Sequence, residues 1–204
     1  MPKQPEQLLQ KEKINELQSR IALYDDMKAY EELYKMLFAK LKNYCFSYVK
    51  SGEAAEELVS DVFIKIWQIR NRLPEIDNLR LYLYTIAKNF SLNYITKNYK
   101  HPVTRLEDMN IEPVISFGNP EELCISADIV HQIRLCICTL PPQCRLIFQM
   151  VKEDGFTYKE VATHLNISVL TVRNQVFIAT RKIAEIIPGY ILSNMGPLIK
   201  SGNL

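Results

Sequence analysis

The stretch TYKEVATHLNISVLTVRNQVFIATRKI, residues 157–183, gives the strongest indication of a fold in this chain. Two helices that cross closely need a small residue at their contact, and Ala162 provides one. Asn166 follows at the turn, where asparagine tolerates the left-handed backbone that a tight turn requires. Ser168 then stands where a helix N-cap belongs, since its hydroxyl can accept from an unpaired N–H. This spacing predicts a helix-turn-helix.

The second helix of this pattern has an apolar face and a polar face. Four residues at helical spacing predict the buried face: Val172, Val176, Ala179 and Ile183. The candidate DNA-binding residues on the other face are Thr171, Arg173, Asn174, Gln175, Ile178, Arg181 and Lys182. Arginine can bind guanine through two hydrogen bonds, and asparagine or glutamine can bind adenine in the same way. Arg181 and Lys182, further along the helix, suit phosphates. A helical hairpin with a solvated polar face is the alternative.

The composition limits the class of protein. The chain has 204 residues, of which 48% are hydrophobic, and a net charge of +2, so we expect one large or two small folded domains. No apolar run approaches the roughly 18 residues of a membrane span, and the N-terminus lacks an apolar signal core. We therefore expect a cytoplasmic protein. The odd number of cysteines, five, favours reduced thiols over a disulfide framework.

A second class of function, a zinc or thiol redox site, depends on the cysteines. Cys136, Cys138 and Cys144 lie close together in the sequence, with His131 nearby. Their spacing is not the usual C-x-x-C, and Cys136 and Cys144 fall within apolar helical patterns, which favours buried structural thiols. The chain also has no glycine-rich phosphate loop, H-E-x-x-H or nucleophile elbow. We therefore expect no catalytic residue, metal, cofactor or small-molecule substrate.

Helical periodicity runs through almost the whole chain and predicts an all-α protein of two small helical domains joined by a linker. The expected segments are an N-terminal extension at 1–21, a helical domain at 22–100, an acidic linker at 101–122, a helix-turn-helix domain at 123–187 and a tail at 188–204. The extension has only a weak apolar stripe, so we expect it to dock loosely. Three helices form the first domain, the third burying Leu83, Ile86, Phe90 and Tyr94.

Three stretches carry a pattern beyond the helix-turn-helix. They are AEELVSDVFIKIW (55–67), LYLYTIAKNFSLNYI (81–95) and LPPQCRLIFQMVKEDGFTYKEVATHLNISVLTVRNQ (140–175). In sequence, order and separation they resemble bacterial extracytoplasmic-function RNA polymerase sigma factors. The resemblance implies two helical domains, one for each promoter element, that bind core RNA polymerase and promoter DNA and direct transcription initiation without catalysis of their own. The alternative is a stand-alone helix-turn-helix regulator that binds DNA without the polymerase.

The resemblance implies that the helix at 55–67 docks on the clamp helices of the largest polymerase subunit. The candidate polymerase-binding residues are Glu56, Glu57, Ser60, Asp61 and Lys65. The alternative is an ordinary solvated acidic helix start, which the helix macrodipole stabilises.

The loop at 73–78 and the helix after it match the family's reader of the minus-ten element. Opening DNA requires capture of an unstacked base and support of the single strand by basic and aromatic groups. The candidates are Arg80, Tyr82, Lys88, Asn89, Asn93 and Lys97. Tyr82 stands where many relatives carry tryptophan. A packing role is the alternative for any tyrosine of this helix, including Tyr84 and Tyr94.

The helix at 168–183 matches the family's reader of the minus-thirty-five element. Many relatives carry basic residues where this chain has Asn174, Gln175 or Ile178, so the promoter sequence does not follow from the resemblance. The acidic linker resembles the connector that runs through the polymerase's RNA path, with a plain spacer as the alternative. The family commonly works with an anti-sigma partner, often membrane-anchored, that masks both domains, and no residue here identifies it.

Overall fold

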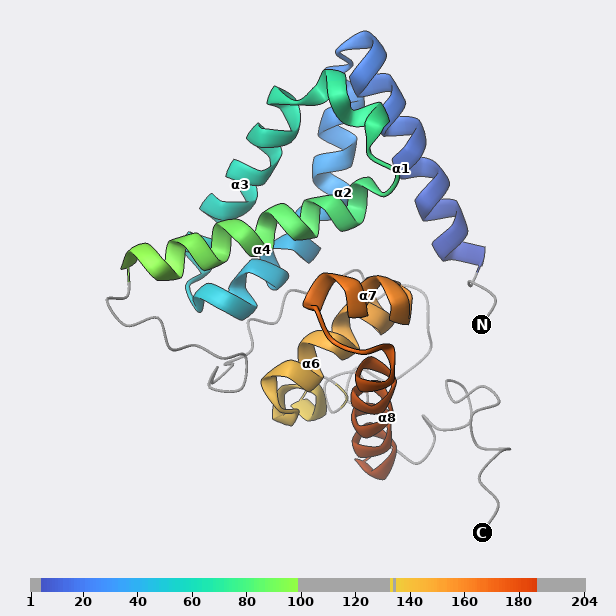
Figure 1. Cartoon of the computed structure of the whole chain (residues 1–204), viewed down its shortest axis with the longest axis vertical. Helices are drawn as coiled ribbons and strands as arrows, with labels where there is room; N and C mark the ends of the chain where they lie inside the picture. The colour runs from blue at the N-terminus through green and yellow to red at the C-terminus, as the bar shows by residue number, and fades with distance from the viewer. Residues whose placement is uncertain (1–4, 99–132, 134, 187–204) are drawn as a thin grey trace. The chain divides into compact units, whose positions relative to one another are not determined.

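The computed structural model describes residues 5–98, 133 and 135–186, and within these ranges it contains helices and short connections but no strand. The chain divides into two compact units, drawn in blue to green and in yellow to red in Figure 1. The prediction of an all-α protein with two helical domains is therefore confirmed. The acidic linker at 101–122 and the tail at 188–204 lie outside the described residues.

The first unit is built from helices on all sides of one core. Its elements are α1 (Pro5–Tyr24), α2 (Met27–Val49), α3 (Gly52–Gln68), the 3₁₀ helix η1 (Arg70–Glu75) and α4 (Leu79–Asn98). Side chains fix the helix starts: the hydroxyl of Ser51 accepts from the N–H of Ala54 at 3.2 Å, and Asn78 Oδ1 accepts from the N–H of Leu81 at 3.1 Å. These caps set where α3 and α4 begin, and thereby which faces of the two helices turn inward.

The buried face of α4 differs in part from the predicted one. Leu83 and Ile86 are buried as expected, but Phe90 and Tyr94 are only half-buried, and Tyr84 is fully buried in the core. The ring of Tyr84 packs against that of Tyr44 from α2, with centroids 4.8 Å apart. The prediction for Phe90 is wrong because the contact with α2 selects a stripe that places Phe90 at its edge. The packing alternative for Tyr84 is confirmed.

Helix α1 is part of the core of the first unit, so the expectation of a loosely docked extension at 1–21 is wrong for residues 9–21. Ile14, Leu17 and Ile21 are buried, at the three- and four-residue spacing of one helix face. The helix contacts α2, η1 and α4 (Figure 1). The stripe looks weak in the sequence because it has few members, but each of them is enclosed by the neighbouring helices.

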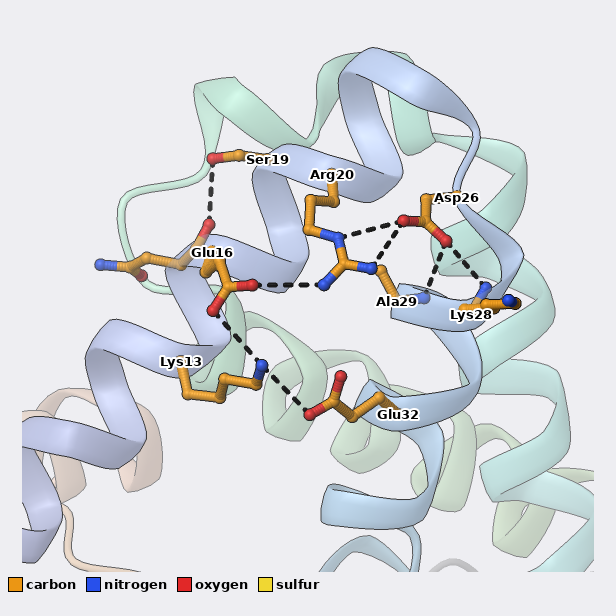
Figure 2. Close-up of polar contacts among 9 residues, drawn as sticks. Lys13, Glu16, Ser19, Arg20, Asp26, Lys28, Ala29 and Glu32 are labelled. Atoms are coloured by element: carbon orange, nitrogen blue, oxygen red, sulfur yellow. Dashed lines mark hydrogen bonds and ion pairs between the residues drawn. The ribbon is translucent and has the colours of Figure 1, made fainter.

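A polar network between α1 and α2 adds to this packing (Figure 2). The guanidinium of Arg20 donates to the carboxylate of Asp26, with Nη2 2.8 Å from Oδ2, while the other carboxylate oxygen accepts from the N–H groups that begin α2. Lys13 lies 3.3 Å from Glu16 in its own helix and 3.2 Å from Glu32 in α2. Partly exposed ion pairs of this kind contribute little stability each, but they fix the direction in which α1 runs.

The second unit contains the helix-turn-helix. Its elements are α6 (Pro142–Phe148), the π-helical turn η3 (Gln149–Glu153), α7 (Tyr158–Leu165) and α8 (Val169–Ile186). Pro142 occupies the first turn of α6, where its missing N–H costs nothing. The core joins α8 to the preceding helices through Cys136, Ile137, Leu140, Cys144, Phe148, Ala179 and Ile183. One face of α8 is thereby held, and the opposite face is left outside.

Candidate functional site

The first helix of the helix-turn-helix, α7, begins with a capping box. The N–H of Thr157 donates to Glu160 Oε2 at 2.7 Å, and the N–H of Glu160 donates to the Thr157 hydroxyl at 3.2 Å. This reciprocal pair satisfies backbone donors that a helix start otherwise leaves open. The helix buries Val161, Ala162 and Leu165, and the burial of Ala162 agrees with the predicted small contact residue.

The turn between α7 and α8 has the predicted geometry. Asn166 adopts the left-handed conformation, with φ 57° and ψ 47°. The N–H of Ile167 reaches back to the carbonyl of Ala162 at 3.0 Å, and the N–H of Asn166 reaches that of Thr163 at 3.3 Å. These two bonds form the Schellman pattern that commonly ends a helix. The prediction of a left-handed residue at Asn166 is confirmed.

The second helix of the motif starts at the predicted cap and buries the predicted stripe. The hydroxyl of Ser168 accepts from the N–H of Thr171 at 2.9 Å, so the N-cap prediction is confirmed. The four apolar residues predicted to be buried are all buried: Val172, Val176, Ala179 and Ile183. Because this stripe holds α8 against its unit, the opposite face is free to enter a groove of DNA.

The DNA-binding candidates of α8 do not form one cluster. Arg173, Asn174, Ile178, Arg181 and Lys182 are exposed, whereas Thr171 and Gln175 are half-buried. Residues three or four apart are neighbours on a helix, so Asn174, Ile178 and Arg181 share the middle of the exposed face. Arg173 and Gln175 are two residues apart and point to opposite edges of that face. Arg173 and Gln175 therefore do not lie side by side on this face.

The polymerase-binding candidates do share one surface. Glu56, Glu57, Ser60, Asp61 and Lys65 are all exposed on α3, opposite the stripe that packs into the first unit. Glu56 forms an ion pair with Lys42 of α2. The remaining carboxylates give the exposed side of α3 an acidic character, which suits a basic partner surface.

The minus-ten candidates fall into two groups on α4. Tyr82, Asn89 and Asn93 are spaced by seven and then four residues, which places them along one side of the helix. Asn89 and Asn93 are exposed, as is Lys97, and Tyr82 is half-buried. A stripe with one aromatic ring and several polar groups is what a single strand of DNA requires.

The other two basic candidates lie away from that stripe. Arg80 is half-buried and donates to Gln10 Oε1 of α1 at 3.4 Å. Lys88 is half-buried too, and its partial burial lowers the pKa of its ammonium group below the usual value. Both side chains are partly covered by the first unit, so their charges are less available than that of Lys97.

Comparison with known proteins supports the assignment of both units. The model of Sigma-70 region 2 matches residues 33–101, and that of Sigma-70 region 4 matches residues 131–183. The ECF RNA polymerase sigma-E factor of Escherichia coli is 28% identical over 165 residues, which cover 78% of this chain and 86% of that protein. RNA polymerase sigma factor YlaC of Bacillus subtilis is 22% identical over 142 residues, 70% of this chain and 82% of that protein.

The chain belongs to the extracytoplasmic-function sigma factors. As such it binds core RNA polymerase and promoter DNA and directs promoter-specific transcription initiation. The match to region 2 disfavours the alternative of a stand-alone regulator, which would need only the helix-turn-helix.

Two solved structures share the fold of this sigma factor. One is the sigma factor RpoE in complex with the anti-sigma factor NepR from Bartonella quintana, with a TM-score of 0.55 and 17% identity, covering 80% of this chain and 99% of that one. The other is CnrH in complex with the cytosolic domain of CnrY, with a TM-score of 0.51 and 17% identity, covering 86% and 97% of the two chains. At this identity the likeness concerns the fold alone.

The structure also exposes apolar side chains that the sequence interpretation of this sigma factor missed. Ile64 is 54% exposed in the middle of the acidic face of α3, three residues after Asp61. On α8, Leu170 and Phe177 are 63% and 58% exposed beside Asn174. The signal was present in the sequence, since none of these three positions falls on the buried stripe of its helix.

The thiols of the sigma factor are mostly interior groups. Cys136 and Cys144 are buried, and the Cys144 thiol donates to the carbonyl of Gln175 at 3.3 Å, which ties α6 to α8. Burial raises the pKa of both thiols above the usual value, which lowers their reactivity. Among the described residues no group of three or more metal ligands comes together, and His131 and Cys124 lie outside them.

None of the helices in the described part of this sigma factor is long and apolar enough to span a bilayer.

Proposed function

We propose that this sigma factor divides promoter recognition between its two units, with α3 on the polymerase, the loop before α4 and α4 itself on the minus-ten element, and α8 on the minus-thirty-five element. One observation carries the proposal. In α3 and α8 alike, the apolar stripe is used by the core of its own unit, so the candidate contact residues on the opposite face are exposed, except for the half-buried Thr171 and Gln175 of α8.

At the minus-thirty-five element, α8 would enter the major groove with its N-terminal half. Arg173, at one edge, has the two donors that match guanine, and Asn174, in the middle, has the donor and acceptor that match adenine. Ile178 would contact the methyl group of a thymine, since apolar side chains distinguish thymine from other bases by that contact. Arg181 and Lys182, near the end of the helix, would hold phosphates and fix the register.

At the minus-ten element, the proposal assigns strand support to α4. Tyr82 would stack on an unpaired base, and Asn89 and Asn93 would contact the strand along the same side of the helix. Lys97 is exposed and would bind the backbone phosphates. Arg80 and Lys88 are half-buried and would contact the strand nearer the body of the first unit. The affinity of both units for DNA should fall steeply with salt, because phosphate contacts release counterions.

On the polymerase, the acidic face of α3 would meet a basic surface, with Ile64 as an apolar anchor inside it. An apolar side chain surrounded by charges is a common arrangement in protein interfaces. Glu56, Glu57, Ser60, Asp61 and Lys65 form the rim of this surface, and Glu56 is already engaged with Lys42.

We expect Asp61→Lys to weaken binding to core polymerase by about tenfold, since it replaces an attraction by a repulsion at an interface rim. Asp61 is exposed and not part of the apolar stripe, so the fold and thermal stability should be unchanged. Fluorescence anisotropy of the labelled full chain against purified core measures the affinity. Glu75→Lys is the matched control, because Glu75 is an exposed carboxylate that lies on η1 and not on the acidic face of α3. Equal affinity of Asp61→Lys and the unchanged chain would remove this residue from the interface.

The whole proposal is tested by transcription in vitro. Purified full chain and core polymerase from the same bacterium are mixed with a randomised promoter library, and the transcript starts are sequenced. The expected result is a set of accurate starts that share one upstream and one downstream element and disappear without the chain. If the chain instead binds the same DNA sites without core polymerase and produces no additional transcript starts, it is a stand-alone regulator.

We also propose how the remaining segments contribute. The first domain extends to about residue 100 and includes α1, the linker occupies 101–122, the helix-turn-helix domain 123–187 and the tail 188–204. The acidic linker would follow the RNA path of the polymerase.

The protein would act in the cytoplasm without catalysis, cofactor, metal or small-molecule substrate. Since two fold relatives were solved with an anti-sigma factor or a cytosolic partner domain, we propose an anti-sigma partner, one that can be membrane-anchored.

A further inference from the structure

A buried amide connects α1 to the loop that precedes α4. The side chain of Gln18 is only 7% exposed, although glutamine is usually a surface residue. Its Nε2 donates to the carbonyl of Leu73 at 2.5 Å and to that of Ile76 at 2.9 Å. Both acceptors are backbone carbonyls, so only the NH₂ end of the amide, with its two donors, fits this place.

The two carbonyls lie where the 3₁₀ helix η1 ends. The last carbonyls of a helix have no partner within it and must be satisfied from elsewhere. Leu73 accepts one bond locally, from the N–H of Ile76 at 3.0 Å, and Gln18 supplies the additional donors from a different helix. Gln18 thus caps the C-terminus of η1 through space rather than along the chain.

The other end of the same loop is also capped by a side chain. Asn78 Oδ1 accepts from the N–H of Leu81 and so begins α4. The segment between Ile76 and Asn78 is therefore fixed at both ends by side-chain amides. Its middle residue, Asp77, is exposed, as are Pro74 and Glu75 on the preceding turn. The backbone of this loop is therefore fixed by hydrogen bonds, while its outer surface is exposed to solvent.

We propose that Gln18 is a positioning residue for the minus-ten reading loop, which it holds in the conformation that receives an unpaired base. This inference depends on the proposed function of the loop at 73–78. A loop that is already ordered does not lose conformational freedom when it binds, so more of the contact energy appears as discrimination between bases. Gln18 itself lies before residue 33, where the match to region 2 begins.

The chemistry of the contact defines a series of variants. Gln18→Met keeps the length of the side chain and removes both donors, and Gln18→Glu turns an oxygen toward two carbonyls. Gln18→Lys retains N–H donors at the end of a longer chain and should restore part of the function. Gln18→Asn keeps the amide and withdraws it by one methylene, which makes it the mildest test.

Two further variants are controls within α1. Ser19→Ala removes an exposed hydroxyl that donates to the carbonyl of Asn15 in the same helix (Figure 2). Ile21→Val removes one buried methyl group and destabilises the unit without touching the carbonyls of η1. The second control separates a loss of stability from a loss of loop position.

The experiment measures transcription by core polymerase with each full-length variant on a promoter taken from the library, and on templates with single substitutions in either promoter element. For Gln18→Met and Gln18→Glu we expect discrimination at one or more minus-ten positions to fall about tenfold, which corresponds to the loss of about one strong hydrogen bond. Discrimination at the minus-thirty-five element and affinity for core should stay unchanged. Gln18→Lys should discriminate better than Gln18→Met, and the discrimination of Gln18→Asn should lie between those of Gln18→Met and the unchanged chain.

Three outcomes are informative. Unchanged minus-ten discrimination in Gln18→Asn and Gln18→Met would overturn the positioning role while leaving the proposed function intact. A loss of equal size at both promoter elements, matched by Ile21→Val, would reduce Gln18 to a structural residue and also overturn it. Failure of the unchanged chain to direct any start would refute the proposed function itself, independently of every Gln18 variant.

Discussion

Replacing Arg173 by alanine is expected to weaken recognition of the matched promoter by about 1–3 kcal/mol, or roughly 5- to 150-fold. The reason is that a guanidinium binds the two acceptors of guanine at once, and no other exposed side chain replaces it at that edge of α8. Asn174 points to the middle of the face and Gln175 to the opposite edge, so neither can reach the same base pair. The loss should be confined to one base position, where the variant accepts other bases.

To measure this loss, transcription from the correct start is compared on a set of promoters, each with one base of the minus-thirty-five element substituted. Arg181→Ala is the matched control in the same helix, since Arg181 is exposed, pairs with Glu185 at 3.2 Å and is assigned to a phosphate. The control should weaken binding on all sequences alike and lower the salt slope by about 0.9. If Arg173→Ala also loses affinity equally on all sequences, Arg173 is a phosphate contact and the base-reading assignment is wrong.

The second large effect concerns the fold. We expect Leu17→Ala to lower the free energy of unfolding of the first unit by about 2–5 kcal/mol, because Leu17 is fully buried and its removal leaves a cavity between α1 and its neighbours. Urea unfolding followed by far-UV circular dichroism measures the change, with the second unit as an internal reference.

Leu9→Ala is the control for this prediction, since Leu9 is an exposed residue of the same helix and should change stability by less than about 0.5 kcal/mol. Similar small effects for Leu17 and Leu9 would show that α1 docks loosely after all. A large loss at Leu17 would also affect the minus-ten loop, because α1 carries the Gln18 amide that caps η1.

The helix-turn-helix was predictable because its determinants are local. The left-handed conformation of Asn166, the cap at Ser168 and the buried stripe of α8 each follow from residues within a few positions of one another. The capping box of Thr157 and Glu160 obeys the same rule and could have been predicted from the spacing alone.

The face of a helix that packs inward was less predictable when several partners compete for it. On α4, the sequence allowed both Phe90 and Tyr84 to be buried, and only the ring of Tyr44 on α2 decides for Tyr84.

The sequence by itself therefore determined the helix ends, the tight turn and the family, because these depend on short-range hydrogen bonds and on residue types in a fixed order. Tertiary structure alone decided the place of α1. Its three apolar residues become a core stripe only when α2, η1 and α4 surround them, and its Gln18 becomes a cap only when the end of η1 is brought to it across 55 positions of the chain. Pairing between residues so far apart in the chain is a property of assembled helices, and the short apolar stripe of α1 did not reveal it.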